Sequence, residues 1–209
     1  MVSMGLTATP DRIRPLGLRT QAAGVRILVR PISASDKGRL RLAMAQLSPV
    51  SRRHRFFSAR SELDDEMVAY LTEVDHRSHF AWAALAVDLP GQPIIAVARY
   101  IVGDQPNTAE FALAVGDEFQ GQGLGTLLFR LLGIVARANG IEHFSASVLA
   151  DNVPMRRLMI AAGARFEVEE VGILRATMDL PSDGGDGSID PGPVVAIARA
   201  AAARAAVAA

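Results

Sequence analysis

The sequence predicts an α+β domain built on one mixed, mostly antiparallel central sheet of about seven strands flanked by helices. Helix-periodic segments come first, and three strand-like runs joined by short polar turns follow them. A glycine-rich turn then enters a long helix, after which a strand, a helix and two further strands complete the pattern. Short polar turns favour antiparallel hairpins, whereas a helix between two strands is the connection that parallel strands need.

The N-terminal part of the chain predicts a lead-in, one strand and three helices. Residues 1–23 carry proline and glycine without a sustained period, which is typical of a flexible lead-in. Residues 25–30 alternate apolar and charged side chains, as a half-buried strand does. Three helices are expected next: one capped by Ser35 or Asp36 and running to about 47, a short one ending near 57, and one over about 62–74.

The remaining elements complete the sheet and end in a separate helix. Strands are expected over 80–87, 94–102, 108–115, 144–149, 165–170 and 173–180, with helices over about 123–139 and 154–162. We expect one domain over 24–180, because residues 181–192 have the Gly, Ser and Asp composition of a linker. Residues 193–209 are rich in alanine and predict a C-terminal helix.

Composition narrows the kinds of partner and site. Basic and acidic residues balance at 22 each among 209 residues, which argues against nucleic-acid binding driven by net positive charge. The chain has no cysteine, which excludes disulfides and thiolate metal sites and favours a cytoplasmic location. No apolar run reaches the roughly 18 residues of a membrane span, and the N-terminus lacks the apolar segment of a secretory signal. A soluble protein without a membrane partner is therefore expected.

A glycine-rich turn, Gln120-Gly121-Gln122-Gly123-Leu124-Gly125, stands between the strand ending at Val115 and the long helix. Glycine permits the backbone angles of such a turn and lets a ligand approach the main chain. The first N–H groups of a helix lack internal partners and, together with the helix dipole, attract phosphate oxygens. A turn whose glycines serve packing alone is the alternative, and the pattern leaves both open. A Walker loop would need a lysine here, and the dinucleotide fingerprint would need its third glycine one residue later.

The pattern Gln120-x-x-Gly123-x-Gly125 resembles the acetyl-CoA loop of the GNAT superfamily of N-acetyltransferases, which reads Arg/Gln-x-x-Gly-x-Gly/Ala. The predicted order of elements is also that of the superfamily, and the resemblance covers about residues 25–180. It implies a sheet splayed between its fourth and fifth strands, where the pantetheine arm of acetyl-CoA lies, and loop amides that hold the pyrophosphate. The residues that it assigns to acetyl-CoA are Leu113, Ala114, Val115, Gln120, Gly121, Gln122, Gly123, Leu124, Gly125, Thr126, Asn152, Met155 and Arg156.

Asn152 precedes a predicted helix that stops at Gly163, an arrangement that the superfamily shares. The resemblance implies that Asn152 contacts the pantetheine arm or the helix N-terminus, and a simple N-cap before Pro154 is the alternative. Many members place a tyrosine, their general acid, seven residues after this asparagine. This chain has Met159 there, so we expect the thiolate to leave unaided or to take a proton from water.

Glu110 is the candidate general base. Glu110, Ala112 and Ala114 share one face of their strand, and the alanines leave room for a ligand beside the carboxylate. An amine with a pKa near 10.4 must lose its proton before it attacks a thioester. A solvated glutamate near a strand end is the alternative. The segment resembles the GNAT domain of bacterial protein-lysine acetyltransferases of the cyclic-AMP-regulated kind, which carry a glutamate base in a matching strand.

The resemblance therefore implies an acetyl-CoA-dependent N-acetyltransferase that acts on a protein lysine by direct attack, with Glu110 as its base. Transfer to a small amine stays open, with Asp64, Asp65 and Glu66 as candidates for an acidic pocket. A non-catalytic acyl-CoA sensor stays open too. Cyclic-AMP control is not expected, because no segment here is long enough for a cyclic-nucleotide domain.

Several other features carry weaker expectations. No metal is expected, and we interpret His76 and His79 as loop or acceptor-channel residues. The basic run over 52–55 is typical of a solvated face, or else it reads acidic flanks of a protein substrate. The C-terminal helix is expected to cover the acceptor groove as a lid or to form a dimer contact, so a homodimer stays open.

Overall fold

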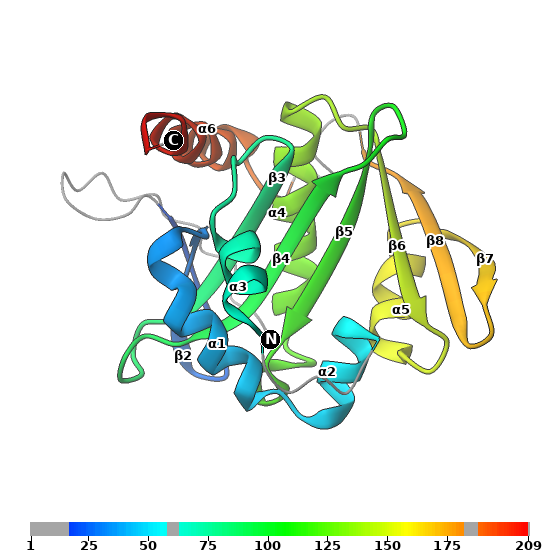
Figure 1. Ribbon diagram of the computed structural model, residues 1–209, viewed down its shortest axis with the longest axis horizontal. Coiled ribbons are helices and arrows are strands. Elements are labelled where there is room, and N and C mark those ends of the chain that lie inside the picture. The colour runs from blue at the N-terminus through cyan, green and yellow to red at the C-terminus, as the bar shows by residue number, and fades with distance from the viewer. Residues whose placement is uncertain (1–16, 58–62, 182–187, 209) are drawn as a thin grey trace.

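The computed structural model describes residues 17–57, 63–181 and 188–208, which form one eight-stranded sheet with helices on both faces (Figure 1). The strand order is β1-β2-β3-β4-β5-β6-β8-β7, and every neighbouring pair is antiparallel except β5 and β6. The predicted α+β class is confirmed. The strands are β1 (Leu18–Ala22), β2 (Val25–Pro31), β3 (His79–Ala86), β4 (Ile94–Val102), β5 (Thr108–Val115), β6 (His143–Leu149), β7 (Arg165–Glu170) and β8 (Ile173–Asp179).

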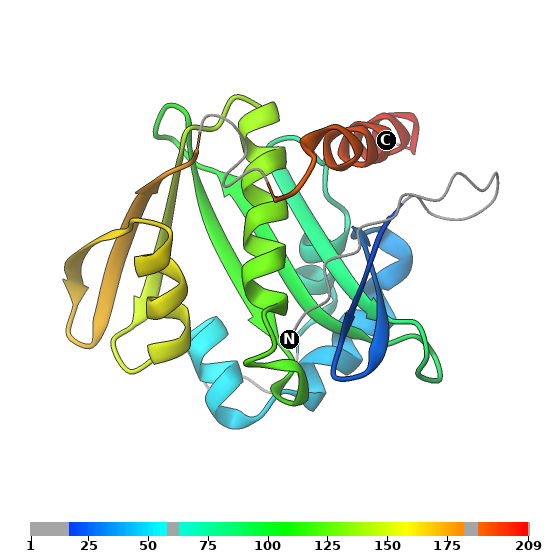
Figure 2. The same ribbon diagram turned by 180° about the vertical axis from the view of Figure 1, so that it is seen from behind.

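The helices form two layers. On one face lie α1 (Lys37–Gln46), α2 (Pro49–Phe56) and α3 (Asp65–Thr72), and on the other lie α4 (Leu124–Ala138) and α5 (Val153–Ala161) (Figures 1 and 2). Two short 3₁₀ turns, η1 (Ala34–Asp36) and η2 (Asp117–Phe119), precede α1 and α4. Each layer encloses its own buried apolar cluster, and the larger one lies under α4, whose apolar stripe is buried along its length. Within the residues described, no helix combines the length and apolar character needed to cross a bilayer.

The N-terminus differs from its prediction, because the expected lead-in over 1–23 contains strand β1. Leu18, Thr20 and Ala22 alternate with exposed or half-exposed neighbours and point into the core. β1 pairs with β2 through a tight turn in which Ala23 and Gly24 have φ of 53° and 73°. Threonine and alanine are too weakly apolar for this short alternation to stand out in the sequence, so we expected about seven strands where the structure has eight.

The C-terminal helix is α6 (Pro191–Ala208), which begins slightly before the predicted 193–209. Val194, Ile197 and Ala198 are buried in the larger cluster, and the helix packs against α4 and β2. Its apolar side is therefore covered by α4 and β2. The lid over an acceptor groove and the dimer contact both stay predictions.

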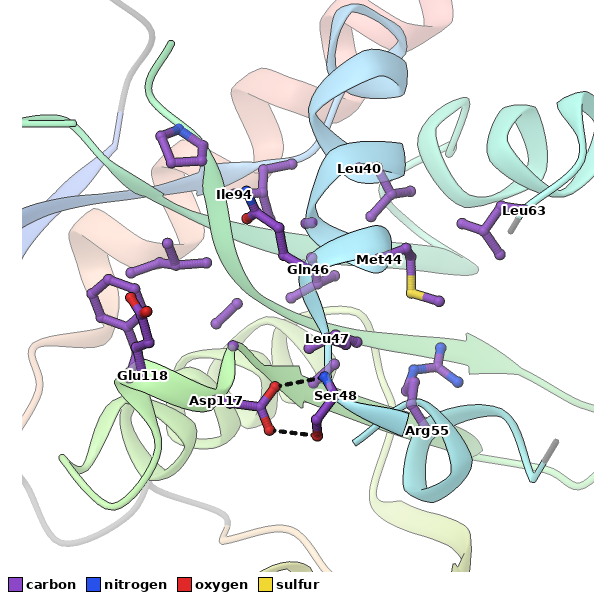
Figure 3. Close-up of a pocket in the computed structure, with 18 of the residues that line it drawn as sticks. Leu40, Met44, Gln46, Leu47, Ser48, Arg55, Leu63, Ile94, Asp117 and Glu118 are labelled. Atoms are coloured by element: carbon purple, nitrogen blue, oxygen red, sulfur yellow. Dashed lines mark hydrogen bonds between the residues drawn. The ribbon is translucent and has the colours of Figure 1, made fainter. Parts of the chain in front are cut away.

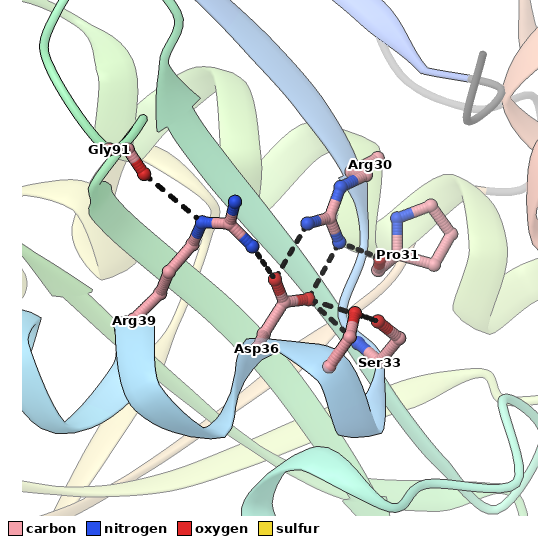
Figure 4. A network of polar contacts seen from close by, with 7 residues as sticks. Arg30, Pro31, Ser33, Asp36, Arg39 and Gly91 are labelled. Carbon is pink, nitrogen blue, oxygen red and sulfur yellow. Dashed lines mark hydrogen bonds and ion pairs between the residues drawn. The ribbon is translucent and has the colours of Figure 1, made fainter.

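A buried ion pair fixes the start of α1 (Figure 4). The predicted side-chain cap by Asp36 is absent, because its carboxylate is turned to Arg30 and accepts two hydrogen bonds of 2.7 and 2.6 Å from that guanidinium. The Ser33 amide donates a third at 3.0 Å. Burial acts to raise the pKa of Asp36, but Arg30 and Ser33 together hold that pKa below its ordinary value. The carboxylate thus joins β2 to the first helix of its layer.

Candidate active site

The sheet has an opening between β5 and β6. The two strands pair only where Thr108–Glu110 meet His143–Ser145, and beyond this point they diverge (Figure 1). Residues 111–115 and 146–149 therefore leave main-chain groups without a partner across the opening, although β6 stays paired with β8 along its whole length. Buried backbone groups need hydrogen-bond partners, so the opening suits a ligand that supplies them. This is the splay that the sequence resemblance implied.

The glycine turn follows β5 directly and leads into α4. Gly121 and Gly123 have φ of 70° and 83°, in the left-handed region that glycine adopts without strain. A Cβ at Gly121 would meet no atom within 4 Å, so the backbone there is open to a ligand. Gly123 is the N-cap of α4, and no side chain in the described part of the chain caps the helix. The N–H groups at 124–126 are therefore suited to an anion, and their contact with the pyrophosphate stays a prediction.

Gly125 has a different role from the other glycines of the turn. A Cβ at this position would lie 3.3 Å from Leu113 Cδ2 and 3.7 Å from Val115 Cγ2. The absence of a side chain lets the first turn of α4 approach β5 closely. The sequence left two roles open for these glycines, packing and a ligand-binding turn. Gly125 is needed for packing, whereas Gly121 and Gly123 are needed for their left-handed backbone conformations.

Gln120 anchors the turn through its side-chain amide. Its Nε2 donates to the Val115 carbonyl at 3.0 Å and to Ser51 Oγ of α2 at 3.1 Å. Gln122 makes a similar bond within the turn, from its Nε2 to the Glu118 carbonyl at 2.9 Å. The Gln of the motif thus fixes the position of the loop relative to β5 and α2, and its side chain is engaged before any ligand arrives.

The residues expected around the start of α5 have structural contacts. Asn152 is buried and accepts a hydrogen bond of 3.2 Å from the Met155 amide, so it is the N-cap of α5. Arg156 Nη1 donates to the Ala150 carbonyl at 3.0 Å, which holds the loop after β6. Met159, where the resemblance led us to look for a tyrosine, is 1% exposed and fills the larger core. The ligand contacts expected of Asn152, Met155 and Arg156 stay predictions.

Glu110 is exposed at the edge of the opening, on the face of β5 covered by α1–α3. Ala112 and Ala114 are half-buried on the same face, as their alternation predicted, whereas Phe111 and Leu113 are buried toward α4. Within the described residues, the charged group that interacts with Glu110 is Arg55 of α2. A carboxylate and a guanidinium therefore flank the same end of the opening.

A cavity of about 540 Å³ lies on this face, between the sheet and α1–α3 (Figure 3). Its wall is mainly apolar, with side chains from α1, α3 and β4, and Ala114 and Gly116 connect it to the end of β5. Arg55 reaches into it from α2 toward Met44 of α1 (Figure 3). The main apolar lining residues are Leu40, Met44, Leu47, Leu63, Leu71, Ile94 and Val97.

Two arginines give the cavity a positive charge. Burial lowers the pKa of Arg99 to about 9, with the charge of Arg55 acting in the same direction. Burial also lowers the pKa of Arg55 to about 10, against the opposing effect of Glu110. Both guanidinium groups remain charged at neutral pH. The basic run over 52–55 was expected to be a solvated face, but Arg55 is instead directed into the cavity.

Helix α2 is bound to both sides of the opening. Asp117, after β5, accepts hydrogen bonds from the Ser48 amide and from the Ser48 and Ser51 hydroxyls at 2.9, 2.8 and 2.7 Å. Asp151, after β6, pairs with Arg53 at 2.7 Å. The sequence does not predict the role of these two carboxylates, because their partners lie more than sixty residues away along the chain. Their position directly after two neighbouring strands was the only signal.

Two histidines at the start of β3 lie in partly enclosed surroundings, with His76 before the strand and His79 as its first residue. His79 Nε2 lies 2.9 Å from Arg99 Nη1, and burial followed by the charge of Arg99 lowers its pKa to about 4. His79 is therefore neutral near pH 7 and accepts a hydrogen bond from the guanidinium. Among the described residues, no group of three His, Cys, Asp or Glu side chains is arranged to hold a metal ion.

A sheet opened between two parallel strands and ended by an uncapped helix is the framework of coenzyme-A-dependent N-acyltransferases. The sequence model of the Acetyltransferase (GNAT) family matches residues 44–163, more than half of the chain, and the chain belongs to this family. Proteins of this family are acetyltransferases that use acetyl-CoA.

Known relatives agree with this assignment. Acetyltransferase Pat of Mycolicibacterium smegmatis is 34% identical over 168 residues, which are 80% of this chain and 49% of that protein. Acetyltransferase PA5475 of Pseudomonas aeruginosa is 31% identical over 140 residues, 67% of this chain and 75% of that protein. The crystal structure of the GNAT domain of S. lividans PAT is similar with a TM-score of 0.68 and 32% identity, covering 75% and 92% of the two chains. The chain thus spans about half the length of the Pat relative.

Proposed function

We propose that this protein transfers the acetyl group of acetyl-CoA to the side-chain amine of a lysine on a protein acceptor, by direct attack within a ternary complex. The observation that carries the proposal is the opening between β5 and β6, which ends at the uncapped start of α4. The chemistry supplied by acetyl-CoA is an activated thioester carbonyl. The residues described here bind that group, orient it and accept a proton.

The residues around the opening fit a coenzyme of this shape. The main chain at 113–115, apart from the Val115 carbonyl that accepts from Gln120, is available to hydrogen-bond the pantetheine arm and the thioester carbonyl, because β6 does not pair with it. The N–H groups at 121–126 suit the pyrophosphate, since the backbone at Gly121 is unobstructed and α4 lacks a side-chain cap. Asn152, Met155 and Arg156 are assigned to the other side of the opening, after β6.

Glu110 is assigned as the general base. Its carboxylate is exposed beside the opening and takes a proton from the attacking amine, directly or through water. The leaving group is the thiolate of coenzyme A. Its conjugate thiol has a pKa near 8.5 by analogy with cysteine, so the thiolate leaves without a strong acid. Met159, buried in the core, supplies no proton.

A protein acceptor is favoured by the resemblance to bacterial protein-lysine acetyltransferases and by the charge around the cavity. A polyamine or an aminoglycoside carries several positive charges and needs an acidic pocket, whereas this cavity holds Arg55 and Arg99. The acidic candidates for a small-amine site have other contacts, since Asp64 accepts from the Met67 amide at 2.8 Å and Asp65 pairs with Arg41. Small polycationic acceptors are therefore disfavoured.

Binding of acetyl-CoA tests the first half of the proposal. At about one hundred times its dissociation constant, acetyl-CoA should add roughly 2.7 kcal/mol to the free energy of unfolding. Replacing Gly121 by Val should weaken this effect, because valine rarely adopts a φ of 70° and its side chain projects toward the ligand. Gly24→Val, at another left-handed turn, is the matched control. If acetyl-CoA did not change the melting temperature of the wild-type protein, the assignment of the opening as an acetyl-CoA site would be contradicted.

Replacement of Glu110 by Gln tests the second half. We expect turnover at neutral pH to fall by about 10²–10⁴-fold, since the amide cannot accept the proton. The dissociation constant for acetyl-CoA should change little. Glu118→Gln, at the rim of the same cavity, is the control and should keep wild-type turnover. Equal turnover in both variants would remove Glu110 from the mechanism, and binding without transfer to any amine would favour a sensor.

A further inference from the structure

The cavity beside Glu110 has a second chemical feature besides its apolar wall, namely a buried cation. Arg99 is 3% exposed and lines the cavity, while its main chain on β4 is paired with Ala112 of β5. Two residues further along β4, Ile101 is paired with Glu110. The guanidinium therefore belongs to the same patch of sheet as the candidate base.

Within the described part of the chain, Arg99 has no carboxylate partner. Its hydrogen bonds go to the Leu71 carbonyl at 3.2 Å and to the neutral ring of His79 at 2.9 Å. Arg55, the second cation, stacks on the ring of Phe56 with 4.7 Å between its Cζ and the ring centroid. The charge of Arg55 lowers the pKa of Arg99, so the two positive charges act on the same region.

The acidic side chains around the cavity do not compensate these cations. Asp117 lines its far end, but it is bound by Ser48 and Ser51. Glu118 is exposed at the rim, and Glu110 interacts with Arg55 but does not line the cavity. A buried cation without a counter-ion costs several kcal/mol, and a guanidinium is the side chain best matched to a carboxylate. Among the residues that the structure describes, the cavity thus lacks one anion.

We propose that the cavity binds a carboxylate group of the acyl acceptor, held by Arg99 and Arg55, with an apolar segment of the same acceptor against Leu40, Met44 and Leu71. The inference rests on the proposed function in one respect, which is that the occupant is the amine-bearing substrate. The carboxylate has two sources: a free amino acid with an apolar side chain, or an acidic residue near the target lysine of a protein. Their shared chemistry is an anion joined to an apolar group a short distance from an amine.

A binding experiment without acetyl-CoA tests the cavity by itself. Hexanoate, hexanamide and hexylamine share an apolar chain and differ only in the charge and hydrogen bonding of the head group. Calorimetry or a thermal shift should show hexanoate binding at least tenfold more tightly than the other two. Arg99→Met should abolish that difference, and Arg55→Met should reduce it. Equal binding of the three compounds by the wild-type protein would overturn the proposal, whatever the result for acetyl-CoA.

Two variants keep the test decisive if one of them folds poorly. Arg55 lies on a short surface helix and is half-buried, so Arg55→Met should fold even if Arg99→Met does not. Arg41→Met, whose charge lies on α1 outside the cavity lining, is the control and should keep the preference for hexanoate. A preference that survives both cavity substitutions would contradict the assignment of the anion site.

Turnover with paired acceptors then identifies the source of the carboxylate. One pair is leucine and leucinamide, and the other is a lysine peptide with Glu or Gln beside the lysine. A preference of tenfold or more for the carboxylate member of either pair, lost in Arg99→Met, supports the proposal and names the source. No preference in either pair would exclude an acceptor carboxylate, even if acetyl transfer itself proceeds.

Discussion

Two buried arginines in this protein have opposite surroundings. Arg30 on β2 is 9% exposed and is paired with the Asp36 carboxylate through two hydrogen bonds (Figure 4). Arg99 on β4 is 3% exposed and contacts only neutral groups, a carbonyl and an imidazole, among the residues described. A buried charge that its own fold neutralises serves stability, whereas one left without a counter-ion beside a cavity indicates a ligand.

The largest effect is expected where the pair is broken. Asp36→Asn keeps the shape of the side chain but leaves Arg30 buried without its counter-ion, so the free energy of unfolding should fall by about 3–5 kcal/mol. Denaturant unfolding measures it. Asp88→Asn is the control, because Asp88 pairs with Arg26, which is 67% exposed, and exposed pairs contribute at most about 1 kcal/mol. Similar losses in both variants would remove the distinction between the two regions.

As the pH falls, the histidines near Arg99 should lower the free energy of unfolding before the Arg30–Asp36 pair does. The pKa of His79 and that of His76 are about 4 when folded and near 6.5 when unfolded, so the unfolded chain binds more protons between these values. Stability is therefore full above pH 6.5 and falls toward pH 4, by up to about 1.4 kcal/mol per pH unit per histidine. Asp36, whose folded pKa is lowered, loses its contribution only at still lower pH.

A histidine variant sharpens this prediction. His79→Gln keeps an acceptor for Arg99 but does not titrate, so the dependence of the unfolding free energy on pH between 6.5 and 4 should become shallower. His143→Gln is the control, because this histidine is exposed and pairs with Asp179 at the far side of the sheet. An unchanged slope in His79→Gln would mean that the ring is already protonated beside Arg99 in the folded protein.

The smallest effect, with the opposite sign, is expected at Arg99. Arg99→Met removes a buried charge that has no carboxylate partner, and methionine fills a similar volume with apolar atoms. We expect the free energy of unfolding to stay constant or to rise by about 1–2 kcal/mol. Arg30→Met should instead lower it, because Asp36 would remain buried with only the longer contact to Arg39, at 3.4 Å, as an ion pair. A loss at Arg99 as large as that at Arg30 would show that both arginines serve stability alone.

Sequence patterns predicted most of this fold because its main strands and helices are strongly periodic. The strands over 94–102, 108–115 and 165–170 begin and end where predicted, since polar turns bound them on both sides. The helix after the glycine turn was predicted within one residue at each end. Strand β1 was missed because its alternation of apolar and polar residues is weak, and its pairing with β2 cannot be seen in the sequence.

The candidate site was predictable only where it is local in the sequence. The turn over 120–125 and the alternation around Glu110 are local. The structure places Glu110 where the pairing of β5 with β6 ends, and the turn beyond the far end of β5. The contacts of Gln120, Asp117 and Asp151 with α2 are not local, and no periodic pattern in the sequence predicts them. Arg99 lies in an apolar strand, where a single arginine indicates either an exposed edge or a buried charge until the neighbouring helices are known.

The contacts of α2 have a consequence for the width of the opening in the sheet. Over most of their length, β5 and β6 are not joined by backbone hydrogen bonds, and the eight-residue helix α2 is attached to the loops that follow both strands. The separation of the two halves of the sheet is thereby governed by a few serine, arginine and aspartate side chains instead of a ladder. Any change in α2 is transmitted to the spacing of two strands that it does not belong to.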